Sequence, residues 1–231
     1  MERGWYYWPN FINEELATRW LCDLRSNSAW VQGSMRMYGK ELLFPRLMAW
    51  YGTERSSYRF SGKTYQPNAF TPLLTEIKDH VEQALICHAE FSDKLPTQGL
   101  NSVLLNWYRQ GQDSMSWHSD DEPELGSTPF IASLSLGASR WFHIKPKNNR
   151  SINGKFEGEE GNYLGHVKNI DLFGDAQPKQ EVKLQKIYLE HGSLLLMFGD
   201  FQRNNVHALP KTKQLVSDRI NLTFRTIFHH E

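Results

Sequence analysis

Three residues in two separate parts of the chain have side chains that could bind one metal ion. His118 and Asp120 stand two positions apart, after a strand-like stretch. In an extended segment such residues share a face, so an imidazole and a carboxylate can meet one cation. His207, in the segment NNVHALP between two expected strands, would supply a third ligand. Two histidines and one carboxylate form the facial triad of non-haem Fe(II) oxygenases, which leaves positions for a 2-oxo acid and dioxygen.

The H-x-D pair does not establish a metal site by itself. Surface turns often hold a histidine beside an aspartate, and zinc accepts the same ligands. Zinc-dependent hydrolysis is therefore an alternative chemistry. The other histidines lack a comparable context and are interpreted as structural or exposed: His80, His88, His143, His166, His191, His229 and His230.

A stretch with two arginines on one face indicates what the metal site would bind beside the metal. Residues 219–225, RINLTFR, alternate between polar and apolar, which is the periodicity of a β-strand. The apolar face belongs to a core, and the polar face carries Arg219, Asn221, Thr223 and Arg225. A guanidinium is a rigid fork that suits a carboxylate, so two of them indicate a dianionic ligand with two carboxyl ends. Zinc hydrolysis would not require this strand; a solvated edge strand remains the alternative.

Length and composition indicate one globular domain over residues 1–231. Hydrophobic residues make up 39% and aromatic residues 13%, which excludes disorder of the whole chain. Basic and acidic residues balance at 26 each, so a nucleic-acid site would depend on local clustering. Cys22 and Cys87 have no CxxC partner, which indicates a reducing environment. No leader or membrane span is recognisable, so we expect a cytoplasmic protein, nuclear if eukaryotic. We also expect a monomer.

The chain is expected to be mainly β, with supporting α-helices. Asn10 is the expected N-cap of a helix over 12–26, and Thr71 opens a second helix, with Pro72 in its first position, that ends near His88. Strand-like runs cover 102–109, 130–137, 140–145, 181–189, 193–198 and 219–228. Many short strands after two N-terminal helices predict a two-sheet β roll.

Two segments stand apart from this pattern. Between residues 30 and 63, six basic residues face two acidic ones, a net charge of +4, and aromatic residues are interleaved with them. Cations for phosphates and flat rings for bases are what a nucleic-acid surface requires, although an ordinary loop-rich half-sheet would look similar. Residues 146–180 show little periodicity and predict a long surface insertion between two strands.

Five motifs in a fixed order carry a family resemblance: NWYRQGQDSMSWHSDDE, IASLSLGASRWF, HGSLLLMFG, HALP and RINLTFR. Together they resemble the AlkB family of Fe(II)- and 2-oxoglutarate-dependent dioxygenases, and most closely the branch that repairs alkylated single- and double-stranded DNA. The resemblance implies a double-stranded β-helix (jelly roll) core over about 100–228, with N-terminal helices and a nucleotide-recognition region at about 30–65. The insertion at 146–180 is longer than the family pattern predicts.

The resemblance also implies a role for individual residues. The iron ligands would be His118, Asp120 and His207. Arg219 would pair with the distal carboxylate of 2-oxoglutarate, assisted by Asn221. Arg225 and Asn106 would lie near the proximal carboxylate, and Tyr108 would contact the co-substrate.

Four further residues match positions that meet the substrate. Tyr58 and Phe60 match the aromatic residues that sandwich a flipped base, and Glu122 matches an acidic group placed against it. Tyr38, in the stretch 37–39, matches a segment that some relatives insert into the duplex. A methylated adenine or cytosine is cationic, which favours stacking between aromatic rings and lowers the cost of base flipping.

The implied reaction is oxidative demethylation of 1-methyladenine and 3-methylcytosine in DNA. It would use Fe(II), 2-oxoglutarate and O2, and would release formaldehyde, succinate and CO2. One alternative keeps the iron and changes the substrate to RNA or a protein side chain, although the basic-aromatic segment favours nucleic acid. Another is a non-catalytic nucleic-acid binder on a degenerate dioxygenase fold, which the intact triad and the R-x5-R strand disfavour.

Overall fold

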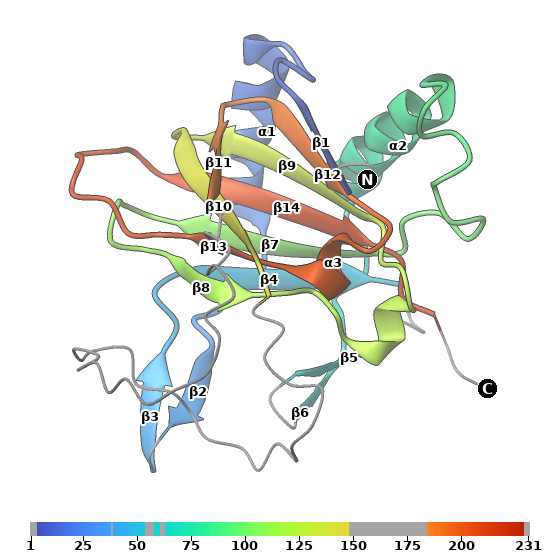
Figure 1. Ribbon diagram of the computed structural model, residues 1–231. Coiled ribbons are helices and arrows are strands. Elements are labelled where there is room, and N and C mark those ends of the chain that lie inside the picture. The colour runs from blue at the N-terminus through green and yellow to red at the C-terminus, as the bar shows by residue number, and fades with distance from the viewer. Residues whose placement is uncertain (1–3, 38, 54–57, 61–62, 148–183, 229–231) are drawn as a thin grey trace, which may run out of the picture.

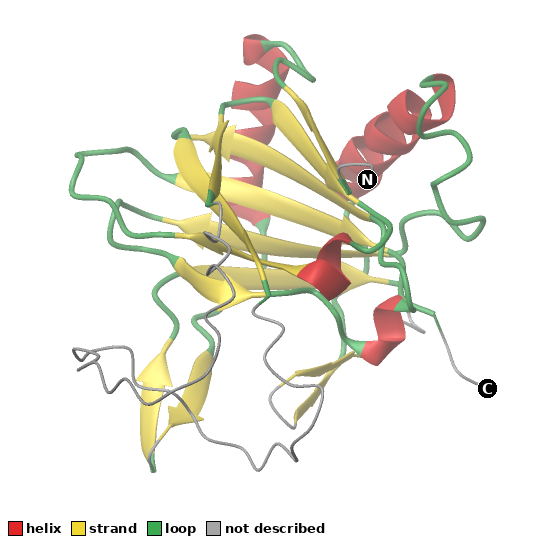
Figure 2. Ribbon diagram, in the orientation of Figure 1, coloured by secondary structure: helices red, strands yellow, loops and turns green. Residues whose placement is uncertain are grey.

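Two antiparallel sheets pack face to face, and two long helices cover the other side of the larger sheet (Figures 1 and 2). The computed structural model describes residues 4–37, 39–53, 58–60, 63–147 and 184–228. The larger sheet has the strand order β1 (Trp5–Trp8), β12 (Ser193–Met197), β9 (Ile131–Gly137), β14 (Arg219–Arg225), β7 (Ser102–Tyr108), β4 (Leu47–Gly52). The smaller sheet has the order β11 (Gln185–Leu189), β10 (Arg140–Pro146), β13 (Asn205–Leu209), β8 (Met115–His118). This arrangement is the predicted jelly roll.

Short hairpins and helices complete the described part of the chain. The hairpins pair β2 (Ser34–Met37) with β3 (Lys40–Leu43), and β5 (Tyr58–Phe60) with β6 (Lys63–Tyr65). The helices are α1 (Glu14–Asn27), α2 (Pro72–Cys87), α3 (Phe201–Asn204) and the 3-10 turn η1 (Pro123–Leu125). Both hairpins extend below the sheets, on the side where β4 and β8 form the sheet edges (Figure 1). The described residues of the region at 30–65 therefore form short strands and loops, as predicted.

The larger sheet is buried on both faces. On one face, Ile220, Leu222 and Phe224 of β14 are fully buried in a core that also contains Trp20 of α1 and Ile77 of α2. A second core fills the space between the two sheets and consists of Ile131, Ile144, Ile187, Leu189, Leu195, Met197 and Phe201. The expected apolar face of the strand at 219–225 is confirmed, whereas the alternative of a solvated edge strand is wrong because β14 lies between β9 and β7.

Each long helix begins at a side-chain cap. Thr71 caps α2, with its hydroxyl accepting a hydrogen bond from the Leu74 amide at 3.2 Å, as predicted. The prediction for the first helix was wrong by two residues at its start. Asn13, not Asn10, accepts from the Leu16 amide at 2.9 Å. Asn10 instead has a φ of 53°, a left-handed conformation that asparagine tolerates better than most residues.

Strands rich in β-forming residues fall where the sequence predicts them, whereas three others were not anticipated. The unpredicted strands are β1, β8 and β13. Residues 115–118 were not predicted to form a strand, but they pair with β13 along the edge of the smaller sheet. The predicted strand at 219–228 ends three residues earlier, at Arg225.

The long insertion predicted at 146–180 lies almost entirely outside the described residues, because β10 ends at Pro146 and the description resumes at Leu184. Cys22 and Cys87 are free thiols on exposed positions of α1 and α2. Among the helices described here, none is long and apolar enough to cross a membrane.

Candidate active site

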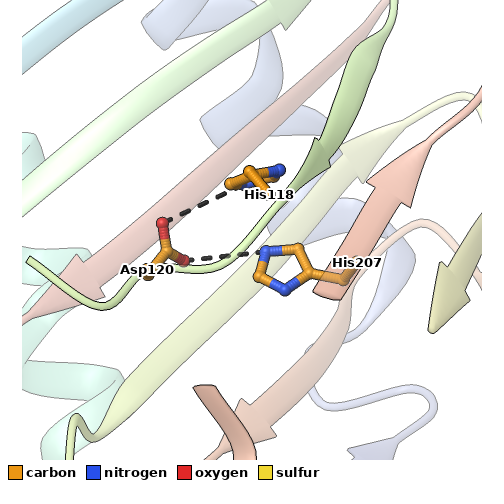
Figure 3. A group of neighbouring side chains, drawn as sticks. All are labelled: His118, Asp120 and His207. Carbon is orange, nitrogen blue, oxygen red and sulfur yellow. Dashed lines mark ion pairs between the residues drawn. The ribbon is translucent and has the colours of Figure 1, made fainter. Parts of the chain in front are cut away.

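The side chains of His118, Asp120 and His207 meet at the smaller sheet, in a cavity that residues of the larger sheet also line (Figure 3). His118 ends β8 and is the direct cross-strand partner of His207 on β13. The carboxylate oxygens of Asp120 lie 4.0 Å from Nε2 of His118 and 3.8 Å from Nε2 of His207. One ligand atom from each residue falls within 4.8 Å of the others. The three predicted ligands therefore converge on one point.

Neighbouring groups hold both imidazoles in position. Nδ1 of His118 lies 2.8 Å from the backbone carbonyl of Ser116. Because a carbonyl oxygen only accepts, Nδ1 carries the proton and Nε2 keeps its lone pair for a metal. His207 is 3% exposed and lies between the rings of Phe142 and Phe201, with centroids 5.2 and 6.1 Å away. Its ring orientation is therefore fixed by packing.

Two groups hold Asp120, and sequence reasoning anticipated neither contact. Its backbone amide donates to Oε1 of Gln202, a fully buried residue of α3, at 3.0 Å. Nη2 of Arg225 donates to Oδ1 of Asp120 at 2.7 Å. The placement of Arg225 near the proximal carboxylate of 2-oxoglutarate stays a prediction, whereas its ion pair with the metal-ligand carboxylate is present in the structure.

Electrostatics put Asp120 and His207 in the protonation states that a metal requires. Burial by itself raises the pKa of Asp120, but Arg225 and the two imidazoles outweigh it and hold that pKa below the usual range. Burial, with a smaller effect from His118, lowers the pKa of His207 to about 3. At neutral pH the site therefore presents an ionised carboxylate and a neutral imidazole. A set of two nitrogen donors and one oxygen donor, of which Asp120 and His207 are buried and His118 is partly exposed, fits divalent iron.

A second group of residues lines the same cavity from the larger sheet. They are Asn106 and Tyr108 of β7, and Arg219, Asn221, Thr223 and Arg225 of β14. All five residues predicted to bind 2-oxoglutarate thus lie on the wall that faces the metal ligands. The polar face of the predicted strand points into this cavity, between the two sheets.

Arg219 is a buried cation with no carboxylate within 4.0 Å among the described residues. Its Nη2 donates to the Ser135 hydroxyl at 2.9 Å, and its guanidinium lies 5.4 Å from the centre of the Tyr108 ring. Its Nε has no hydrogen-bond partner in the described part of the chain. Burial lowers the pKa of Arg219 to about 10, so the group remains charged at neutral pH. A buried, incompletely satisfied cation suits an anionic ligand.

The two amides of this wall are held by the protein. Asn221 donates to the Ser133 hydroxyl at 2.8 Å and to the Leu134 carbonyl at 3.0 Å. Asn106 accepts a 2.7 Å hydrogen bond from Nε of Arg46, which is 5% exposed. The sequence placed Arg46 only among the basic residues of the segment 30–63. In the structure it fixes the orientation of the Asn106 amide.

The predicted base-contacting residues are only partly described. Glu122 precedes η1, and its Oε2 is buried without a hydrogen-bond partner among the described residues. The backbone of Tyr58 and Phe60 forms β5, but their side chains lie outside the described part, as does Tyr38. Their roles toward a base stay predictions.

A His-Asp-His set inside a jelly roll, facing a buried arginine, defines a non-haem iron oxygenase that uses a 2-oxo acid. The chain belongs to the 2OG-Fe(II) oxygenase superfamily, whose family model matches residues 4–225. Two solved structures share the fold. OsALKBH1 has a TM-score of 0.58 at 18% identity, covering 98% of this chain and 99% of that one. A prolyl hydroxylase from Trichoplax adhaerens has a TM-score of 0.56 at 14% identity, covering 97% and 83%.

Curated relatives confirm the resemblance to the AlkB family. Alpha-ketoglutarate-dependent dioxygenase alkB homolog 3 of Mus musculus is 35% identical over 225 residues, which cover 96% of this chain and 65% of that protein. DNA oxidative demethylase ALKBH2 of Homo sapiens is 34% identical over 193 residues, which cover 84% of this chain and 60% of that protein. The chain thus spans less than two thirds of the length of these relatives.

Proposed function

We propose that this chain is an Fe(II)- and 2-oxoglutarate-dependent demethylase that repairs alkylated bases in DNA, with 1-methyladenine and 3-methylcytosine as substrates. One observation carries the proposal: the converging ligand set of His118, Asp120 and His207 shares a cavity with Arg219, a buried cation without a carboxylate partner in the described residues. The names of the two relatives, a dioxygenase and a DNA oxidative demethylase, support the reaction and the DNA substrate.

The chain's own residues divide the task between the two sheets. The smaller sheet would hold Fe(II) through His118, Asp120 and His207, while Arg219 on the larger sheet would bind one carboxylate of 2-oxoglutarate. When bound, these groups would supply, together with O2, the oxidising chemistry that turns an N-methyl group into a hydroxymethyl group, with loss of formaldehyde and production of succinate and CO2. Arg225 keeps Asp120 ionised, and Phe142 and Phe201 limit the access of water to His207.

Glu122 supports an alkylated base as the substrate. An N1-methylated adenine or N3-methylated cytosine carries a positive charge, and the buried Oε2 of Glu122 is a carboxylate oxygen without a protein donor in the described residues. Glu122 lies two positions after the metal ligand Asp120, so its backbone is close to the metal site. A cationic base would both donate to this oxygen and pair with its charge, whereas a neutral base could offer only a hydrogen bond.

The test is a single-turnover reaction. The full chain is loaded anaerobically with Fe(II) and 2-oxoglutarate, and is then mixed with air and an oligonucleotide that contains 1-methyladenine. We expect succinate and formaldehyde in equal amounts with loss of the methyl group. His118→Ala removes a ligand and should abolish both iron binding and turnover. His80→Ala, on the exposed side of α2, is the matched control and should behave as the wild type.

Other outcomes would redirect or overturn the proposal. Slow succinate formation without loss of the methyl group would place the reaction on another substrate, to be sought among methylated RNA and peptides. Binding of the oligonucleotide with no succinate from any methylated substrate would indicate a non-catalytic binder. Full activity in His118→Ala would contradict the metal site itself.

A further inference from the structure

The outer face of the smaller sheet, which points away from the metal site, carries exposed rings and lysines. We call this surface the minor-sheet outer face. Side chains alternate along each strand, so the neighbours of the buried residues point outward. The outward-pointing residues are Trp117 of β8, Trp141, His143 and Lys145 of β10, and Lys186 and Tyr188 of β11. None of them takes part in the site described above.

Aromatic rings form a row across this face. Trp117, Trp141 and Tyr188 are 41%, 50% and 43% exposed. Trp141 and Tyr188 are direct cross-strand partners, with ring centroids 4.8 Å apart. His143, two residues along β10 from Trp141, lies 6.3 Å from the Trp117 ring. Three large exposed rings on one sheet face mark an interaction surface rather than scattered surface residues.

The charge of this face is entirely basic. The four strands β8, β10, β11 and β13 contain no aspartate or glutamate, whereas Lys145 and Lys186 lie among the rings. Nζ of Lys145 is 4.3 Å from the centre of the Trp117 ring. Lys186 is the cross-strand partner of His143. Burial, and then the charge of Lys186, lower the pKa of His143, so its ring is neutral at pH 7.

A hollow lies at one end of the row of rings. It has a volume of about 230 Å³, and its walls include Trp117, His143 and Lys211. A flat ring and a cation thus border the same depression. This pairing suits a planar group that carries a negatively charged neighbour, which is the chemistry of a nucleotide base beside its phosphate.

We propose that the minor-sheet outer face binds a single strand of nucleic acid. Bases would stack on Trp117, Trp141 and Tyr188, and phosphates would lie against Lys145, Lys186 and Lys211. Stacking accepts any base because every base has a flat face, so this surface would hold the strand without reading its sequence. The inference rests on the proposed function for its biological purpose. The minor-sheet outer face would give the enzyme a second binding surface for the strand, behind the sheet that carries the metal ligands.

The test measures binding of an unmodified fluorescent oligothymidylate of about 15 nucleotides to the full chain, by anisotropy at several salt concentrations. The variant K145E/K186E should weaken binding at least tenfold. It should also lower the slope of log K against log salt by about 1.4, because two phosphate contacts are lost and each contributes about 0.7 on a single strand. Trp141→Ala should weaken binding about fivefold or more, given roughly 1–3 kcal/mol per stacked base.

A matched control separates this surface from the general effect of charge. R19E/K94E makes the same change in net charge at residues of α1 and of the loop after α2, behind the larger sheet. It should bind almost as the wild type does, and circular dichroism should show that all variants are folded. Equal losses in the two double variants, or wild-type affinity in K145E/K186E and Trp141→Ala, would overturn the inference. If a protein segment covered this face, K145E/K186E and Trp141→Ala would bind with wild-type affinity.

The binding experiment requires no turnover. A wild type that binds the oligonucleotide through these residues but makes no succinate would leave this inference standing and remove the demethylase proposal. If the wild type demethylated DNA and the variants bound the oligonucleotide as tightly as the wild type, this inference would be wrong and the demethylase proposal would stand.

Discussion

Asp120 is held by protein groups at both its backbone amide and its side-chain carboxylate. Oε1 of Gln202 accepts a hydrogen bond from the backbone amide of Asp120 at 3.0 Å, and Nη2 of Arg225 donates to the Asp120 carboxylate at 2.7 Å. The two histidines thus meet a carboxylate whose position and charge are already set. Preorganisation of this kind lowers the free-energy cost of assembling a metal site, because few rotamers remain to be restricted when the ion binds.

Arg219 leads to a prediction about the co-substrate. Arg219→Met removes a buried charge that we expect to meet a carboxylate, and charge-assisted hydrogen bonds contribute about 1.5–3 kcal/mol each. KM for 2-oxoglutarate should rise about 100-fold while affinity for Fe(II) is kept. Arg219→Lys keeps the charge but loses the fork, so its KM should be intermediate. Steady-state succinate assays measure KM for both variants, and anaerobic titration measures their affinity for Fe(II). Arg203→Met, at an exposed position, is the control. An unchanged KM in Arg219→Met would remove Arg219 from the co-substrate site.

His207 leads to a prediction about pH. Its pKa is about 3 in the folded protein and about 6.5 when unfolded. The unfolded chain therefore binds more protons between these values, and stability must fall as pH is lowered from 6.5 toward 3. The loss should reach a few kcal/mol, since one pKa unit corresponds to about 1.4 kcal/mol. Asp120, whose folded pKa is also lowered, adds a further loss below about pH 4.

Urea unfolding of the metal-free protein at several pH values measures this dependence. His207→Gln should flatten the profile between pH 6.5 and 4, whereas His80→Gln should leave it unchanged. Parallel profiles for His207→Gln and the wild type would show that another group is responsible.

Sequence patterns revealed the residues whose spacing is local. H-x-D and R-x5-R are short enough for strand periodicity to place their members on one face, and the structure has them there. Arg46 and Gln202 were missed as partners because their contacts join residues 60 and 82 positions apart. No local pattern encodes such a pair. A buried arginine looks the same in a sequence as an exposed one.

At the level of elements, the strands that carry the metal ligands were the hardest to predict. β8 reads MSWH and β13 reads NVHAL, and both are short and partly polar. They become strands because they pair with each other and β13 pairs with β10. Strands such as β9 and β14 are seven residues long and carry apolar residues at alternating positions, so they were predicted from the sequence alone.

The start of α1 gives a prediction about stability. Asn13→Ala removes the side chain that accepts from the Leu16 amide and should lower the free energy of unfolding by about 1 kcal/mol. Asn10→Gly is the control: glycine adopts the φ of 53° readily, so stability should change by only a few tenths of a kcal/mol. Urea unfolding distinguishes the two variants. A larger loss in Asn10→Gly would mean that Asn10 is the residue that stabilises the helix start.

At the scale of the whole molecule, the larger sheet separates two functions. One face packs on α1 and α2 through apolar side chains, and the other supplies the polar wall of the cavity. Alternation along β14 lets a single strand serve both faces. The sequence predicts this two-sided strand and the two-sheet roll, because both follow from local periodicity. It does not predict the strand order, which depends on pairings between distant segments.

The segment between Lys147 and Leu184 can be tested as an insertion into an otherwise complete fold. Every cross-strand pair that β10 makes with β11 and β13 involves residues outside this segment. Ile144 and Gln185 are direct partners, so the two ends of the segment lie close together. Replacing residues 148–183 with a four-residue Gly/Asn/Ser turn should therefore keep the fold and the Fe(II) affinity, with the midpoint of thermal unfolding within a few degrees.

Ile144→Ala shows that the same assay detects damage to the core. Ile144 is 2% exposed between the two sheets, and its truncation should cost about 2–5 kcal/mol. Calorimetry and anaerobic Fe(II) titration compare the two variants with the wild type. If the shortened chain unfolded as easily as Ile144→Ala, or lost its iron affinity, residues 148–183 would be part of the folded core. The jelly roll would then depend on more than the strands described here.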